Sequence, residues 1–230
     1  MSNALFLFDV DGTLVDAGGA GKRALSRMFE QMAGVPEAFR NYNFSGKTDQ
    51  QIIRDAWQVW LSRDPTPEEV EQARRGYIAL LLEEMARPGY RSRVLPGVRT
   101  LLETLRSLSV PTGLSTGNIE EGAHIKLAAV DLWHFFPFGG FGSDSADRAE
   151  LTALGARRGR TLTGKNIPDH RVFVVGDSPL DVDAAHRAGF VSVAVMTGWS
   201  TRDEILAKRP EFLFDDLSDT PTLLDALDVK

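Results

Sequence analysis

The chain has 230 residues and a formal net charge of −6, so it can bury a sizeable core as one large domain or as one domain with a modest insertion. An acidic balance without a run of lysine and arginine disfavours nucleic acid and anionic membranes as partners, because both require a basic face. Cysteine is absent, which excludes disulfides, thiolate catalysis and cysteine zinc sites. The sequence shows no apolar stretch of membrane-spanning length and no signal-peptide pattern at its start, so a cytoplasmic protein is expected.

The first predicted element is a buried strand over residues 5–8, a short and aromatic apolar run. Asp9 and Asp11 follow directly, one residue apart, so the pleat should point both carboxylates the same way. Two converging anions are costly unless a cation or a proton compensates them. Gly12 lets the backbone turn sharply and approach a ligand closely. The segment therefore suggests a metal site with one carboxylate free to act as a nucleophile.

Residues 16–90 show the pattern of several helices and of no convincing strand. Apolar residues between 24 and 32 recur at helical spacing, and Thr48 can cap a second helix. A third helix is predicted to begin sharply at Thr66, because Pro67 suits the first turn and Glu69 completes a capping box. This part of the chain is thus predicted to be all-helical.

From residue 91 onward, strands and helices alternate along the chain. The predicted strands cover about 112–115, 138–141, 172–175, 191–195 and 212–214, and the predicted helices about 98–105, 119–130, 148–162, 180–188, 201–207 and 222–227. Such alternation predicts an α/β fold, a Rossmann-like parallel sheet wrapped by helices. The helical segment interrupts the alternation, so we interpret residues 1–15 and 91–230 as the core domain and 16–90 as an inserted helical cap domain.

A second pair of carboxylates follows the strand predicted at 172–175. Asp177 lies at the strand end, and Asp181 lies about one turn into the next helix. All strand C-termini of a parallel sheet open on one edge, so Asp9, Asp11, Asp177 and Asp181 should crowd a single pocket. Asp181 alone would be explained as a helix N-terminal acid. Together, four carboxylates need a hard cation, and oxygen ligands suit magnesium.

Between the two acidic segments, the predicted strand at 112–115 ends in a hydroxyl, a glycine and a helix start. A hydroxyl in that position can hydrogen-bond a phosphate oxygen. Thr116 fits the position best, Ser115 is the runner-up because a shift of one residue exchanges them, and an ordinary helix cap is an equal alternative.

These three segments, residues 9–13, 114–118 and 176–181, resemble motifs I, II and IV of the haloacid dehalogenase superfamily of phosphohydrolases, in the right order. The resemblance covers nearly the whole chain. The helical insertion resembles the α-helical cap of phosphoglycolate phosphatases and β-phosphoglucomutases. The expected fold is therefore a haloacid dehalogenase-like core with an α-helical cap.

The resemblance implies a two-step phosphoryl transfer that uses Mg²⁺ as cofactor. Asp9 would attack phosphorus, and Asp11 would protonate the leaving alcohol and then deprotonate the attacking water. Asp9, Asp177 and Asp181 would hold the metal, Asp181 directly or through a water, together with the backbone carbonyl of Asp11. The candidate phosphate and substrate contacts are Gly12, Thr116, Gly117 and Asn118.

Motif III of that superfamily is usually a lysine, and here the sequence departs from the pattern. The region 147–151 contains no lysine, so we assign the role to Arg148, whose guanidinium can supply charge and grip phosphate. Lys165 is the alternative, and a surface salt bridge would explain either residue. Residues 46–49 resemble a cap loop that reaches over the site in phosphoglycolate phosphatase-like members, which makes Lys47 a candidate substrate contact or an ordinary solvated lysine.

The sequence therefore predicts a magnesium-dependent phosphatase acting on a small phosphorylated metabolite, with phosphoglycolate as the family-level candidate. Dehalogenases of the superfamily lack an acid at the position of Asp11, so that residue favours phosphoryl chemistry. A phosphomutase of the β-phosphoglucomutase type and a catalytically silent phosphate-binding module are the alternatives. The sequence leaves open which phosphomonoester is used and whether the protein is a monomer or a homodimer.

Overall fold

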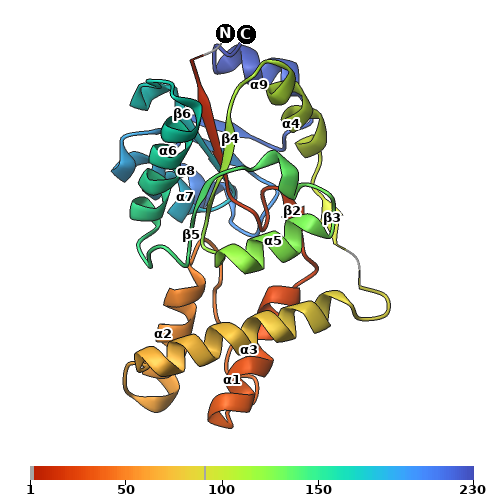
Figure 1. Cartoon of the computed structure of the whole chain (residues 1–230), viewed down its shortest axis with the longest axis vertical. Helices are drawn as coiled ribbons and strands as arrows, with labels where there is room; N and C mark the ends of the chain where they lie inside the picture. The colour runs from red at the N-terminus through yellow and green to blue at the C-terminus, as the bar shows by residue number, and fades with distance from the viewer. Residues whose placement is uncertain (1–2, 91) are drawn as a thin grey trace.

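The computed structural model describes residues 3–90 and 92–230 of the chain. Over these residues the main sheet has six strands in the order β5-β4-β1-β6-β7-β8, and all neighbours are parallel (Figure 1). The strands are β1 (Leu5–Phe8), β4 (Thr112–Thr116), β5 (Gly139–Phe141), β6 (Val172–Gly176), β7 (Val191–Val195) and β8 (Phe212–Phe214). The predicted α/β fold with a Rossmann-like parallel sheet is confirmed.

Strand β1 lies at the centre of the sheet and is buried on both faces. Its side chains alternate, so that Leu5 and Leu7 pack on one face of the sheet, and Phe6 and Phe8 on the opposite face. The helices of the first face are α6 (Arg148–Thr163) and α7 (Pro179–Ala188), and those of the second are α4 (Val98–Ser107), α5 (Glu120–Ala128) and α9 (Thr220–Ala226). Burial on both faces explains why the strand is a continuous apolar run.

Smaller elements complete this part of the molecule. Helix α8 (Arg202–Leu206) packs through Ile205 against Val182 and Ala194, and short 3₁₀ turns cover Trp133–Phe135 and Asp169–Arg171. The predicted elements beyond residue 91 agree with the observed ones to within two residues at each end. None of the helices in the described ranges has both the length and the apolar character that a membrane crossing demands.

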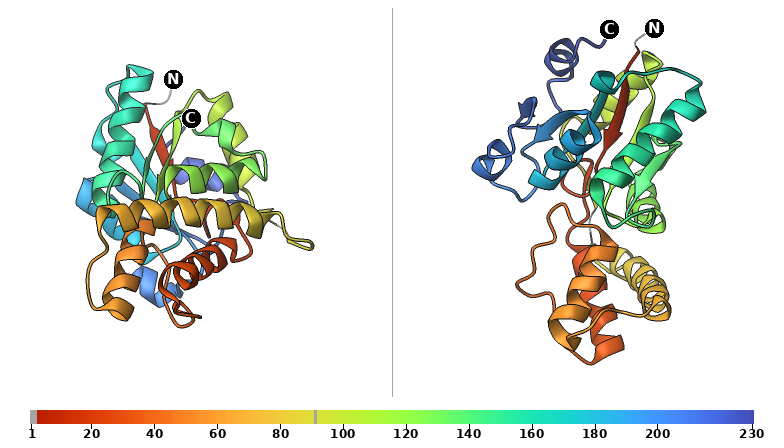
Figure 2. Two further views of the ribbon diagram at one scale, coloured as in Figure 1. Left: turned by 60° about the horizontal axis from the view of Figure 1, so that its bottom comes forward. Right: turned by 90° about the vertical axis from the view of Figure 1, so that its left-hand side faces the viewer.

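Helices α1 (Ala20–Ala33), α2 (Asp49–Leu61) and α3 (Pro67–Met85), which we call the cap helices, lie together beyond the carboxyl ends of the sheet strands (Figures 1 and 2). They enclose a separate apolar core whose largest buried side chains include Met28, Phe29, Trp57, Tyr77 and Leu81. The capping box of Thr66 and Glu69 forms as predicted, and the Thr48 hydroxyl caps α2 by accepting from the Gln51 amide.

Two short strands that the sequence analysis did not predict connect the two parts. Strand β2 (Val15–Asp16) pairs antiparallel with β3 (Arg93–Val94), where the chain leaves the sheet and returns to it. Strands of two residues carry no hydrophobic periodicity, so pattern analysis cannot detect them. The predicted division into residues 1–15 with 91–230 and residues 16–90 falls beside this pair and stays a prediction.

Candidate active site

Three buried carboxylates meet at the carboxyl edge of the sheet. Asp9 follows β1, Asp177 follows β6, and Asp181 lies in the first turn of α7. These strands are neighbours with Phe8 opposite Val175, so their ends lie side by side. One oxygen from each carboxylate lies within 4.8 Å of the other two, which is a separation at which one cation could contact all three.

The Asp177 carboxylate is held against backbone on two sides. A Cβ added at Gly12 would lie 2.6 Å from Asp177 Oδ2, and one added at Gly198 would lie 1.6 Å from the same atom. Gly12 also has a φ of 83°, which a residue with a side chain rarely adopts. The Thr13 hydroxyl donates to Asp177 Oδ1 at 3.1 Å. The glycines therefore make room for the carboxylate, and the Gly12 predicted as a ligand contact lies against Asp177.

Arg148 is the cation that lies against this carboxylate group. Its buried Nη2 is 2.9 Å from Asp9 Oδ1 and also donates to Asp181 Oδ1. Its Nη1 donates to the Gly46 carbonyl at 3.0 Å, so the same guanidinium reaches the loop before α2. Lys165, the alternative, donates instead to the Ser109 carbonyl and does not line the pocket. The structure therefore brings Arg148, and not Lys165, to the carboxylates.

The electrostatics of the group favour binding of a cation. Burial raises the pKa of Asp9 to about 6; Arg148 opposes this shift, and the neighbouring Asp181 adds to it. Burial and then the charges of Asp181 and Asp9 raise the pKa of Asp177 well above its ordinary range. Crowded, desolvated carboxylate oxygens are the donor set that a hard cation such as magnesium requires. The residues present thus fit the predicted metal.

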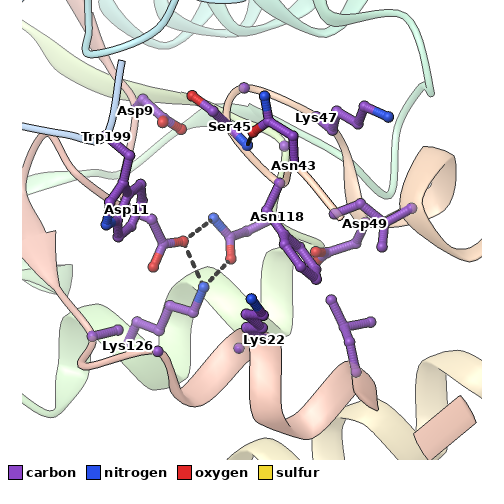
Figure 3. A pocket seen from close by; sticks show the side chains of 18 of the residues that line it. Asp9, Asp11, Lys22, Asn43, Ser45, Lys47, Asp49, Asn118, Lys126 and Trp199 are labelled. Carbon is purple, nitrogen blue, oxygen red and sulfur yellow. Dashed lines mark hydrogen bonds and ion pairs between the residues drawn. The ribbon is translucent and has the colours of Figure 1, made fainter. Parts of the chain in front are cut away.

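Asp11 faces a different set of partners. Its Oδ2 accepts from Lys126 Nζ at 2.5 Å and from Asn118 Nδ2 at 2.9 Å, and Lys126 Nζ also donates to Asn118 Oδ1 at 2.6 Å (Figure 3). The Asp11 carboxylate is not part of the three-carboxylate group around Asp9. The two carboxylates of motif I therefore serve separate parts of one pocket.

Lys126 was missed by the sequence analysis, although it is buried in the centre of this site. It lies on α5 about two turns beyond Asn118, and that spacing is the one sequence signal that could have indicated it. Burial lowers the pKa of its ammonium, but the charges of Asp11 and Asp49 outweigh burial, so the net shift is upward and the lysine stays charged. Asp49 is itself buried and accepts from the Ile119 amide at 2.9 Å.

The two candidate hydroxyls, at the end of β4, point to opposite sides. Ser115 Oγ lies 2.7 Å from Thr152 Oγ1 of α6, away from the pocket. Thr116 Oγ1 accepts from the backbone amide of Asn118 at 3.2 Å and from its side-chain Nδ2 at 2.9 Å. The structure thus places Thr116, the preferred residue, beside the site, where it is fully buried and orients Asn118. A contact between Thr116 and phosphate stays a prediction.

Gly117, directly after β4, packs closely against the loop before α2 and the start of α2. Its carbonyl accepts from the Asp49 amide at 2.8 Å, and a Cβ at this position would lie 2.2 Å from the Lys47 carbonyl. The Lys47 side chain points away from Asp11 (Figure 3). Its ammonium donates to Asp55 at 2.8 Å and to the Tyr42 hydroxyl at 2.9 Å. Lys47, which is predicted to contact the substrate, is therefore already paired with the Asp55 carboxylate.

A cavity of about 500 Å³ lies between the carboxylate edge and the cap helices. Its lining includes Asp9, Asp11, Asn118, Lys126, Arg148 and Asp177 from the sheet side, and Lys22, Tyr42, Phe44 and Lys47 from the cap side. Trp199, which is 67% exposed, also lines the cavity. The cavity is large enough for a small organic phosphate, and charged groups of both signs line it.

Comparison with known proteins agrees with this site. The family model described as haloacid dehalogenase-like hydrolase matches residues 6–195. A phosphoglycolate phosphatase of Pseudomonas putida is 30% identical over 221 residues, which are 93% of this chain and 76% of that protein. A hydrolase structure from Pseudomonas syringae has a TM-score of 0.76 at 21% identity, over 96% of this chain and 98% of that one. A β-phosphoglucomutase structure from Clostridium difficile has a TM-score of 0.70 at 17% identity, over 98% and 97% respectively, and shares the fold. With its acidic site at the strand ends, the chain belongs to the haloacid dehalogenase-like hydrolases and is an enzyme of the phosphatase type.

Proposed function

We propose that this protein is a magnesium-dependent phosphatase that hydrolyses a small phosphomonoester through an aspartyl-phosphate on Asp9. The observation that carries the proposal is the buried Asp9 carboxylate, which shares one group with Asp177 and Asp181 and lies against Arg148. The similarity to a phosphoglycolate phosphatase makes phosphoglycolate the first substrate to test.

In the proposed first step, a carboxylate oxygen of Asp9 bonds to phosphorus while the bond to the ester oxygen breaks. Asp11 gives its proton to the departing alcohol. In the second step, water attacks the phosphorus of the aspartyl-phosphate and gives a proton to Asp11, which releases inorganic phosphate and restores both residues. Arg148 offsets negative charge on the phosphoryl oxygens throughout.

The carboxylates of Asp9, Asp177 and Asp181 would hold magnesium, which supplies positive charge beside the phosphoryl group. We propose that the Asp11 carbonyl also serves as a ligand, and that Gly12, Thr116, Gly117, Asn118 and Lys47 are the substrate contacts to test. The expected cytoplasmic location and the choice between monomer and homodimer stay predictions.

Residues 16–90 would act as a cap that excludes bulk water from the site. Three contacts support this role: Arg148 with the Gly46 carbonyl, the Asp49 amide with the Gly117 carbonyl, and Ser45 Oγ 3.1 Å from Ser200 Oγ. Two of them join the loop before α2, and the third joins Asp49 at the start of α2, to the carboxyl edge of the sheet. A small phosphorylated metabolite bound in the cavity would be covered by this loop.

Phosphate release from a panel of small phosphomonoesters, with and without magnesium, tests the proposal. We expect magnesium-dependent release by the unsubstituted protein and a loss of several orders of magnitude in Asp9→Asn, because the amide cannot form the covalent intermediate. Asp169→Asn, at a carboxylate that is 62% exposed, is the matched control and should keep full activity. Turnover by Asp9→Asn at the unsubstituted rate would overturn the mechanism, and transfer of phosphate to a sugar phosphate in place of release would favour a phosphomutase.

A further inference from the structure

Lys126 is a buried cation with no part in the chemistry described above. Its side chain is 4% exposed, whereas the Asp11 carboxylate that it contacts is 26% exposed. Its neighbours on α5, Ala123 and Leu127, are apolar core residues. Burying an ammonium costs free energy that an apolar residue would not cost. A lysine at this position therefore needs an explanation beyond the packing of α5.

The contacts of Lys126 restrict the Asp11 carboxylate to one arrangement. Asp11 Oδ2 accepts from both Lys126 Nζ at 2.5 Å and Asn118 Nδ2 at 2.9 Å. The lysine also donates to Asn118 Oδ1 at 2.6 Å, so three side chains form a closed set of hydrogen bonds. No hydrogen bond to Asp11 Oδ1 is seen in residues 3–90 and 92–230. One oxygen is therefore held by the protein, and the other is available to a ligand.

The Asn118 amide is itself oriented from the far side. Its Nδ2 donates to Thr116 Oγ1 at 2.9 Å, and its backbone amide donates to the same hydroxyl at 3.2 Å. The arrangement thus runs from a fully buried hydroxyl through Asn118 to Lys126 and Asp11. Asp11 is anchored by Asn118, in the loop after β4, and by Lys126 on α5, both far from its own strand in the sequence.

We propose that Lys126 is a positioning residue for Asp11: with Asn118 it holds Oδ2, so that Oδ1 meets the oxygen of the leaving alcohol. This inference rests on the proposed phosphatase function. It predicts that removing Lys126 slows the hydrolysis of esters whose alcohol needs a proton to leave. A small misplacement of the group that gives this proton lowers the rate strongly. An ester with a good leaving group needs little help from Asp11 and should be affected little.

The test compares kcat/KM for the best alkyl phosphomonoester of the panel with kcat/KM for 4-nitrophenyl phosphate, both at saturating magnesium. For Lys126→Met we expect a loss on the order of a hundredfold with the alkyl ester, and a change of less than about threefold with 4-nitrophenyl phosphate. Lys126→Arg keeps a cation and should recover part of the loss with the alkyl ester. Lys208→Met removes an exposed lysine paired with Asp183 and should change neither value.

Equal losses with both esters in Lys126→Met would show a merely structural role and overturn the inference, as would no loss with either. Failure of both Lys126 variants to fold would do the same, because it would mark the ion pair as a part of the core. If the unsubstituted protein releases phosphate from no ester, the proposed function fails and this inference fails with it. If the unsubstituted protein is active but Lys126→Met shows none of the expected difference between the two esters, the inference fails and the proposed function stands.

Discussion

Replacing Arg148 with methionine would remove the cation that lies against Asp9 and Asp181. The guanidinium is buried, and its Nη2 lies 2.9 Å from Asp9 Oδ1. At an effective dielectric constant of about 20, one pair at that distance has a Coulomb attraction of about 6 kcal/mol. Part of this attraction offsets the desolvation of the charges on folding. Removing one partner of a buried pair therefore costs about 3–5 kcal/mol, because the remaining carboxylates are left uncompensated.

Magnesium should restore part of this stability if the three carboxylates bind it. A ligand that binds only the folded protein adds about 2.7 kcal/mol at a concentration a hundredfold above its Kd. We therefore expect Arg148→Met to lose about 3–5 kcal/mol in the presence of a chelator. A large part of that loss should return at saturating magnesium, because the metal takes over the compensation of Asp9 and Asp181.

Urea unfolding followed by circular dichroism measures both effects. With a slope of about 1–3 kcal/mol per molar urea, the expected loss moves the midpoint by about 1 M or more. The matched control is Arg187→Met, which removes a guanidinium that is 57% exposed and lies 2.6 Å from Asp147. An exposed ion pair of this kind contributes little to stability, so the urea midpoint of Arg187→Met should equal that of the unsubstituted protein within error.

Two outcomes would contradict this prediction. If Arg148→Met unfolds at the same urea concentration as Arg187→Met, the carboxylates at the strand ends do not depend on the buried guanidinium. If magnesium stabilises neither the unsubstituted protein nor Arg148→Met, the three carboxylates do not form the metal site.

Two further predictions concern the same edge of the sheet. Without magnesium, the free energy of unfolding should rise as the pH falls from about 7.5 to about 5. Burial raises the pKa of Asp9 and Asp49 in the folded protein to about 6, from an ordinary 3.8. Their ionised forms therefore destabilise the folded protein fully above about pH 6, and protonation relieves this destabilisation as the pH falls below about 6. Glu69, with a folded pKa of about 2 against an ordinary 4.5, loses its contribution only below that window. Urea midpoints that fall or stay level with acidification in chelator would contradict this expectation. Gly198→Ala should weaken magnesium binding, measured by calorimetry, because the new Cβ would lie 1.6 Å from Asp177 Oδ2. Gly122→Ala is the control and should leave magnesium binding unchanged, because its new Cβ would lie 3.5 Å from the nearest atom, on Ile119.

The features of this protein that depend on a local pattern of residues could be predicted without a structure. The run at residues 5–8 is apolar throughout because β1 is covered on both faces, and this makes a buried strand readable without a structure. The capping box of Thr66 and Glu69 is formed within four residues, so it was predictable as well. Asp9 and Asp177 could be assigned to one site because parallel strands open on one edge.

The side chains that meet in the pocket come from distant parts of the chain, so their contacts could not be predicted from the sequence. The ion pair of Lys126 with Asp11 joins residues 115 positions apart, and no local pattern indicates a contact of that range. Thr116, and not Ser115, lies beside Asn118, because neighbouring residues of a strand face opposite sides. The fold brings Arg148, and not Lys165, close to the carboxylates. A charge acts strongly on them only where it lies close and water is removed from around it.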